Sequence, residues 1–269
     1  MKQLFFILLV FGSFQLSAQG ETEWKEDKSI PCDSNSVWGV DVLGNVYIST
    51  KDLVQKYDSV AVLKFSQSQK SLGRISSIQP INTMKVIAFS EEQQIVCFFD
   101  NTLTQSEDCI ELSTNFIQNA TMVVTSAQPN KIWVYDQLNS KLYLLSIGET
   151  SQQQEIDNLR GILNSSQFSQ LIERNNQLLL LNQNKGVYVM DMYGSLIESI
   201  EMANLLKVDA DAINYYFITK DKLIIQHKKS NQQITLSLPA DNVIDFIKRG
   251  SYFYFKTNDK IKKYTLIFK

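Results

Sequence analysis

The sequence predicts an all-β fold, a β-propeller built from six four-stranded blades. Short runs rich in Val, Ile, Leu, Tyr and Phe fill the chain after its first twenty residues, and polar corners separate them. The runs recur in units of four, and the third run of successive units ends near Asp58, Asp100, Ser146, Asp191 and Lys228, at intervals of 42, 46, 45 and 37 residues. A period of about 40 residues with four strands per unit is typical of propeller blades.

Residues 1–18 have the pattern of a secretory signal peptide. Lys2 gives a basic start, an apolar stretch runs from Leu4 to Phe14, and Ser17-Ala18 supplies the small residues of a cleavage site. The apolar stretch is shorter than the roughly 18 residues that span a bilayer, and no later stretch reaches that length. Residues 19–269 are therefore expected to form a single exported domain without a transmembrane segment, in the periplasm or at the cell surface. The junction at Ala18-Gln19 resembles that of exported proteins of Bacteroidota.

Five complete units follow the predicted signal peptide. The first, residues 36–65, contains the strands SVWGVD, NVYIST, DLVQKYD and AVLKF, and Gly44-Asn45 supplies residues that tolerate positive φ at its first corner. The other four units are predicted at residues 75–112, 122–157, 168–202 and 208–238. Within the irregular segment 147–167, the stretch NLRGIL is predicted to form a helical turn on the rim.

The sixth unit, residues 242–269, supplies only three strands. An open ring would leave strand edges unpaired, so we expect residues 23–30 to provide the missing outer strand and close the ring. Two alternatives remain from the sequence. One is a β-sandwich of repeated hairpins, and the other is a ring of five or seven blades.

The charge of the chain is close to balanced but unevenly distributed. The net charge is −2, yet from Leu205 onward there are 12 Lys and Arg against 6 Asp and Glu, and before it 14 against 22. The pattern favours solvated strand faces, and the alternative is a basic flank that meets an acidic partner or a phosphate surface. No Arg-rich or RNA-binding signature is present, so a nucleic-acid partner is not expected.

Cysteine usage also fits an exported protein. Cys97 and Cys109 lie 12 residues apart on neighbouring predicted strands, which makes them a candidate disulfide, and Cys32 is left over. The chain has no CxxC pair and a single histidine, His227, so a zinc site is not predicted.

The sequence contains one set of candidate metal-binding residues. The predicted innermost strands carry five acidic residues whose oxygens could bind Ca²⁺ if they converged on the channel: Asp41, Glu173, Asp209, Asp211 and Asp245. Nucleophilic hydrolysis is not supported, because His227 lies away from any GxSxG-like turn. The sequence therefore assigns no catalytic residue, and no cofactor is expected.

Two stretches, VWGVDVLGNVYISTKDLVQKYDSVAVLKF and KGVYVMDMYGSLIESI, resemble blades of NHL/TolB-like and quinoprotein-like six-bladed propellers. In those families a phrase of the type D-x-x-G-N-V-Y precedes a strand that ends in K-Y-D. The resemblance implies a scaffold whose members mostly bind other proteins, and it carries no site residues to this chain. We therefore expect a non-catalytic, monomeric, exported module that binds a protein partner, as an accessory of an envelope or secretion assembly. The alternative is a metal-dependent hydrolase or lactonase, or a sugar-binding propeller, that uses acidic residues at the channel mouth.

Overall fold

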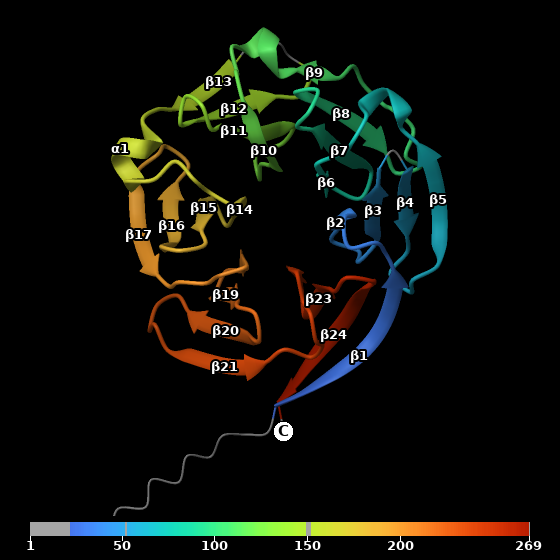
Figure 1. The fold of residues 1–269 in the computed structure, drawn as a ribbon, viewed down its shortest axis with the longest axis vertical. Helices are drawn as coiled ribbons and strands as arrows, with labels where there is room; N and C mark the ends of the chain where they lie inside the picture. The colour runs from blue at the N-terminus through green and yellow to red at the C-terminus, as the bar shows by residue number, and fades with distance from the viewer. Residues whose placement is uncertain (1–21, 52, 149–151, 269) are drawn as a thin grey trace, which may run out of the picture.

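Six antiparallel four-stranded sheets form a ring around a central channel in the computed structural model, which describes residues 22–51, 53–148 and 152–268 (Figure 1). This arrangement confirms the predicted six-bladed β-propeller. The predicted signal peptide and its cleavage site lie outside the described residues. In the described part of the chain, no helix is long and apolar enough to cross a membrane.

Each of the first five blades is one contiguous stretch of chain whose first strand is innermost. Blade 1 contains β2 (Val37–Val40), β3 (Val46–Thr50), β4 (Leu53–Tyr57) and β5 (Leu63–Ser68). Blade 2 contains β6 (Ser77–Pro80), β7 (Lys85–Ser90), β8 (Ile95–Asp100) and β9 (Ile110–Glu111). Blade 3 contains β10 (Ala120–Thr125), β11 (Lys131–Asp136), β12 (Lys141–Ser146) and β13 (Gln152–Ile156).

The second half of the ring follows the same order. Blade 4 contains β14 (Gln170–Arg174), β15 (Gln177–Asn182), β16 (Gly186–Asp191) and β17 (Leu196–Glu201). Blade 5 contains β18 (Lys207–Ala210), β19 (Asn214–Ile218), β20 (Lys222–His227) and β21 (Gln233–Ser237). In the described part of the chain, three short helices connect blades: η1 (Lys70–Leu72), η2 (Leu112–Asn115) and α1 (Leu159–Leu163), the last at the predicted helical turn.

Blade 6 combines the two ends of the described chain. Its strands are β22 (Asp245–Arg249), β23 (Tyr252–Lys256), β24 (Lys260–Phe268) and, outermost, β1 (Thr22–Pro31). β1 runs antiparallel to β24, with Thr22 opposite Phe268 (Figure 1). The predicted closure of the ring is thereby confirmed. Across this pair the Nζ of Lys262 lies 3.0 Å from a carboxylate oxygen of Glu26, and that of Lys263 lies 3.7 Å from Asp27.

Aspartates at the strand ends build the repeated corners. The carboxylate of Asp58 accepts hydrogen bonds from the backbone N–H groups of residues 60 and 62, and Asp100 and Asp191 do the same in their own blades. These Asx-type turns reverse the chain between the third and fourth strands. Between β2 and β3, Gly44 adopts a φ of +82°, a conformation that favours glycine.

The apolar core lies between the blades. The runs of aromatic residues in the last two blades show how both faces of a sheet are used: Phe253 and Phe255 pack against Trp24 with ring centroids 5.1 and 5.5 Å apart. Tyr254 points to the other face and packs against Trp38 and its neighbours in blade 1. Because every blade is covered on both faces, these aromatic side chains serve packing.

Candidate functional site

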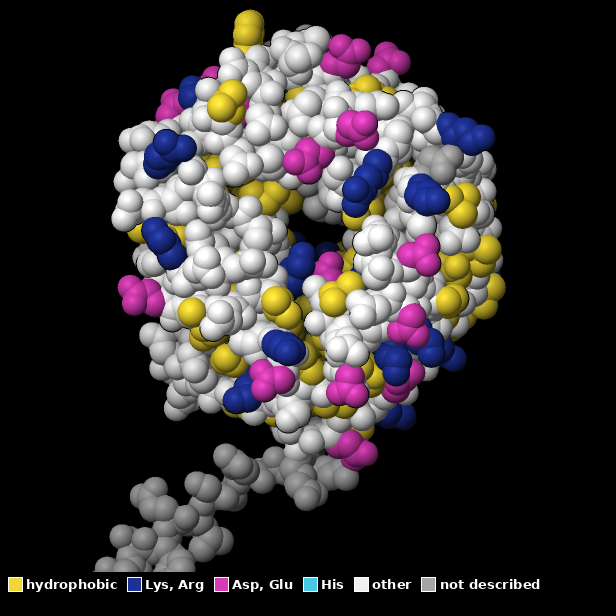
Figure 2. All heavy atoms as spheres, in the orientation of Figure 1, with side chains coloured by type: hydrophobic (Ala, Val, Ile, Leu, Met, Phe, Trp, Pro, Cys, Tyr) yellow, Lys and Arg dark blue, Asp and Glu magenta, His cyan; other side chains and the backbone are white. Residues whose placement is uncertain are grey.

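The central channel is the candidate site, because the innermost strands of all six blades meet there. It holds a cavity of about 260 Å³ lined by residues of β2, β6, β10, β14, β18 and β22. Figure 2 shows the opening at the centre of the ring, with basic and acidic side chains at its edge. Six charged side chains line the cavity: Glu173, Arg174, Lys207, Asp209, Asp245 and Arg249.

Side chains join neighbouring inner strands, which belong to separate sheets. The Gln79 amide donates to the carbonyl oxygen of Val123 at 3.0 Å and accepts from the Thr125 N–H at 3.3 Å, linking blades 2 and 3. Gln170 makes the same pair of bonds to the backbone of Val208, both at 2.9 Å, linking blades 4 and 5. These amides satisfy strand groups that would otherwise face the channel unpaired.

Blade 1 is tied to both of its neighbours at the channel. Trp38 donates from its indole nitrogen to the carboxylate of Asp245 at 2.9 Å, and Lys207 lies 3.4 Å from the same carboxylate. On the other side, a Cβ added at Gly39 would lie 2.7 Å from the carbonyl oxygen of Ile78. Only glycine lets β2 and β6 approach this closely.

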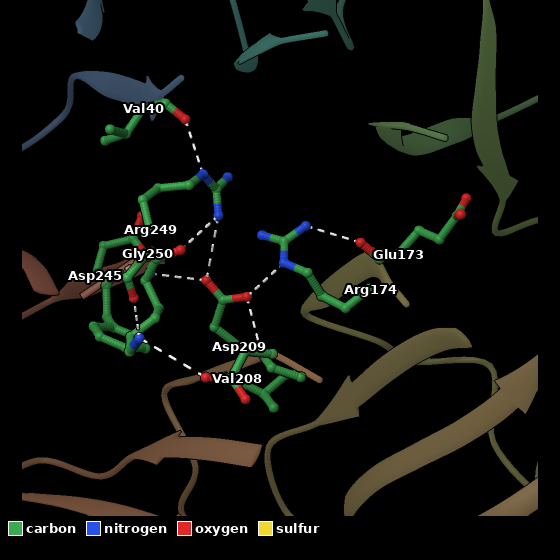
Figure 3. A network of polar contacts seen from close by, with 12 residues as sticks. Val40, Glu173, Arg174, Val208, Asp209, Asp245, Arg249 and Gly250 are labelled. Carbon is green, nitrogen blue, oxygen red and sulfur yellow. Dashed lines mark hydrogen bonds and ion pairs between the residues drawn. The ribbon is translucent and has the colours of Figure 1, made fainter. Parts of the chain in front are cut away.

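The most concentrated polar cluster joins Arg174, Asp209 and Arg249, which come from blades 4, 5 and 6. Asp209 is 2% exposed, and its carboxylate lies between the two guanidinium groups (Figure 3). The Nε of Arg174 donates to Asp209 at 2.7 Å, and an Nη of Arg249 lies 3.7 Å from its other oxygen. The backbone N–H of Lys248 donates to the same carboxylate at 2.9 Å, which ties blade 5 to blade 6. Finally, the Nε of Arg249 donates to the carbonyl oxygen of Val40 at 3.0 Å, reaching blade 1.

The charges in this cluster are mutually dependent. Burial alone would raise the pKa of Asp209, but the charges of Arg174 and Arg249 outweigh it and hold the pKa below its usual range. Burial and the nearby charge of Arg174 lower the pKa of Arg249 to about 10. Asp209 is therefore ionised at neutral pH, with two cations sharing its charge.

The remaining predicted acids are engaged individually. Asp41 and Asp211 lie in corners just beyond their inner strands: Asp41 accepts from the backbone N–H groups of Leu43 and Asn45, and Asp211 accepts from the hydroxyl of Tyr216. Asp211 also accepts from the backbone N–H groups of Ile213 and Asn214, so both carboxylates are bonded within their own corners.

Glu173 lines the cavity, but its carboxylate points away from Arg174 (Figure 3). Its carboxylate accepts hydrogen bonds from the Ser126 hydroxyl at 2.7 Å, the Ala127 N–H at 3.0 Å and the Trp133 indole at 2.8 Å, joining blades 3 and 4. Within residues 22–51, 53–148 and 152–268, no three Asp, Glu, His or Cys side chains form a group that could hold a metal ion. Glu173, Asp209 and Asp245 thus join neighbouring blades, whereas Asp41 and Asp211 are bonded within their own corners.

The structure joins Cys97 on β8 to Cys109, just before β9, in a disulfide with Cα atoms 4.3 Å apart. Cys32 is a free, half-buried thiol. Burial raises the pKa of Cys32, which disfavours the reactive thiolate.

The two channel arginines were not identified from the sequence. The chain has four arginines, and Arg174 and Arg249 are each the last residue of an inner strand, β14 and β22. Their shared position at the end of an inner strand is the sequence feature from which they could have been identified. Because the inner strands of all blades run in the same direction, both arginines lie at the same mouth of the channel.

Four of the six blades carry exposed apolar side chains on the face of that mouth. They lie in or directly after the turns between the first and second strands of blades 1, 2, 5 and 6, here called the mouth corners: Val42, Leu43, Met84, Ile213 and Tyr252, the last being the first residue of β23. These turns directly follow inner strands, so they lie on the face where Arg174 and Arg249 end their strands. The mouth therefore combines an apolar rim with a polar floor.

No family model matches the chain, and no curated protein matches it. Among solved structures, the Neurospora crassa Pan2 WD40 domain is similar with a TM-score of 0.63 at 9% identity, covering 90% of this chain and 95% of that one. A crystal structure of BBS1N in complex with ARL6DN, soaked with mercury, is similar with a TM-score of 0.57 at 12% identity, covering 87% of this chain and 76% of that one. These similarities show a shared propeller fold.

Proposed function

We propose that this protein is a non-catalytic β-propeller that binds a protein partner through the mouth corners. The observation that carries the proposal is the set of exposed Val42, Leu43, Met84, Ile213 and Tyr252 side chains around one opening of the channel. Exposed apolar side chains that gather on one face of a protein are typical of interaction surfaces. The similar structure of BBS1N, which is described as a complex with ARL6DN, supports the use of such a scaffold for binding.

The roles of the channel acids support a binding module over an enzyme. Glu173, Asp209 and Asp245 each accept hydrogen bonds or ion pairs from another blade. These carboxylates hold neighbouring blades together at the channel. They therefore stabilise the surface that a partner would contact.

We further propose that the protein acts outside the cytosol, as an accessory of an envelope or secretion assembly. The disulfide between Cys97 and Cys109 supports an oxidising compartment, and residues 1–18 have the composition of an export signal. The D-x-x-G-N-V-Y phrase that begins at Asp41 supports blades of the NHL/TolB-like or quinoprotein-like type, and the Ala18-Gln19 junction supports a Bacteroidota source. N-terminal sequencing of the protein from its native cells should begin at Gln19, and recovery from the cytosol with residues 1–18 attached would contradict export.

Site-specific photo-crosslinking tests the binding surface. A photoreactive residue at Ile213, on the mouth corners, should form an adduct with a protein partner in native cells. Leu138 provides a matched control, since it is similarly exposed, at 64% against 58%, but lies in the β11–β12 turn on the opposite face. An adduct pattern that is the same at both positions would contradict the proposal.

The partner identified in this way is then purified and its affinity measured by calorimetry. Leu43→Asp should weaken binding at least tenfold, because it places a charge in an apolar contact, whereas Leu138→Asp should leave the affinity unchanged. Equal affinities for the two variants would place the binding surface elsewhere.

A further inference from the structure

Two guanidinium groups at the channel mouth retain unused hydrogen-bonding capacity. Arg174 donates through Nε to Asp209 and through Nη1 to the carbonyl oxygen of Glu173 at 2.8 Å. Arg249 donates through Nε to Val40 and through Nη1 to its preceding residue, also at 2.8 Å. Within the described residues, the Nη2 group of neither arginine donates a hydrogen bond. Figure 3 shows the two groups on either side of Asp209, with their hydrogen bonds and ion pairs drawn.

The charged side chains that line the cavity are balanced, three acids against three bases, but the cluster of Arg174, Asp209 and Arg249 is positive. The two arginines share the single carboxylate of Asp209, so one positive charge is in excess at this position. The carboxylate of Glu173 points away from Arg174 (Figure 3) and is held by Trp133 in blade 3. Asp245 is paired with Lys207 and Trp38. Asp41, the other acid close to Arg249, is held by its own corner.

The arginines are also accessible. Their side chains are 25% and 26% exposed, and both line the central cavity of about 260 Å³. This volume admits a side chain or a chain end, whereas a folded domain would remain on the rim formed by the mouth corners. The positive charge is held in a partly desolvated setting, where an ionic hydrogen bond is stronger than at an open surface.

We propose that Arg174 and Arg249 form a carboxylate-binding site at the channel mouth that takes an acidic side chain or the C-terminal carboxylate of a peptide segment of the partner. The inference rests on the proposed function and deepens it by naming the chemistry of the segment that enters the channel. A planar guanidinium matches a carboxylate with parallel N–H groups, which lysine cannot do. The mouth corners would contact the apolar residues on either side of the acidic group.

The small number of arginines makes a direct test practical. The chain has four, Arg74, Arg160, Arg174 and Arg249, so the ¹⁵N spectrum of arginine Nε–H groups has four signals, which four Arg→Lys variants assign. The folded protein is titrated with Ac-Gly-Glu-Gly-NH₂ and with Ac-Gly-Gly-Gly-OH, which present the two sources of a carboxylate. Ac-Gly-Gln-Gly-NH₂ and inorganic phosphate are the comparison probes, at constant ionic strength.

Saturable shifts of the Arg174 and Arg249 signals with at least one of the two carboxylate peptides, and not with the Gln peptide, are the expected result. The signals of Arg74 and Arg160, which lie outside the channel, should stay in place. No saturable shift at the channel arginines, equal shifts with the Gln peptide, or saturation by phosphate alone would each overturn the carboxylate assignment.

Two variants separate binding from a purely structural role. Asp209→Asn removes the competing carboxylate, so it should tighten binding of the effective peptide by about tenfold at low salt. Arg249→Lys should weaken it several-fold, and Arg160→Lys is the matched control. Unchanged affinity in the Asp209→Asn protein would contradict the proposal. If no peptide binds but the crosslink from Ile213 forms, the carboxylate site is wrong and the proposed function stands.

Discussion

Replacing Asp209 by Asn should be among the most destabilising single polar substitutions at the channel. The change leaves Arg174 and Arg249 facing each other without the carboxylate that now lies between them at 2.7 and 3.7 Å. Removing one partner of a fully buried ion pair costs roughly 3–5 kcal/mol of unfolding free energy. Because the two guanidinium groups are about a quarter exposed and the Asn oxygen can still accept a backbone hydrogen bond, we expect about 3 kcal/mol, the lower end of that range.

The unfolding free energy that Asp209→Asn loses should become smaller as the pH falls. The folded-state pKa of Asp209 lies below its unfolded value, so the carboxylate contributes stability that is fully present above the unfolded pKa of about 3.9. That contribution disappears as the pH falls through the folded-state pKa, where the wild-type residue also becomes neutral. The difference in unfolding free energy between the wild type and Asp209→Asn should therefore be full at pH 7 and shrink below about pH 4.

Urea denaturation followed by tryptophan fluorescence, repeated between pH 7 and pH 3, measures this difference. Asp241→Asn, at an exposed position in the connection to blade 6, is the matched control and should have no effect. A difference below about 0.5 kcal/mol at pH 7, which is typical of neutral surface substitutions, would refute the reasoning. So would a difference that stays constant down to the lowest pH.

Three further predictions concern the closure of the ring and the disulfide. Deleting residues 22–31 should lower the melting temperature and expose the edge of β24, and an unchanged melting temperature would show that β1 does not close the ring. Reversing Lys262 and Lys263 to Glu should lower thermal stability more at low salt than at high salt, because each replaces an attraction to Glu26 or Asp27 by a repulsion; equal losses at both salt concentrations would contradict this. Peptide mapping by mass spectrometry should find Cys97 bonded to Cys109, and Cys109→Ser should cost about 3 kcal/mol on the chain-entropy model; a bridge to Cys32 would contradict the pairing.

The blades were predictable because each is built from contacts that are local in sequence. Apolar alternation marks the strands, and corners such as those at Asp58 and Asp191 bond the residues that immediately follow them. Ring closure was also predictable, since the sixth unit lacked a strand and the segment before Ser36 could supply it.

The contacts between side chains in the channel were harder to predict from the sequence. Arg174, Asp209 and Arg249 are separated by 35 and 40 residues and meet only because the ring brings the ends of three inner strands together. The sequence placed acids near the channel but gave no information on their hydrogen-bond donors. The donors to Glu173 come from blade 3, whereas those to Asp41 come from its own corner. Neither could be inferred from strand periodicity.

The way β1 meets β24 also determines how the ring responds to tension. Thr22 and Phe268 are neighbours at one end of an antiparallel pair, so a force that separates the two ends of the propeller loads the ladder from that end (Figure 1). The hydrogen bonds between β1 and β24 would then break one after another, as in a zipper, because they do not share the load as they would in shear. A pull on one terminus would peel β1 away while the other five blades, each complete within its own stretch of chain, keep all of their strands.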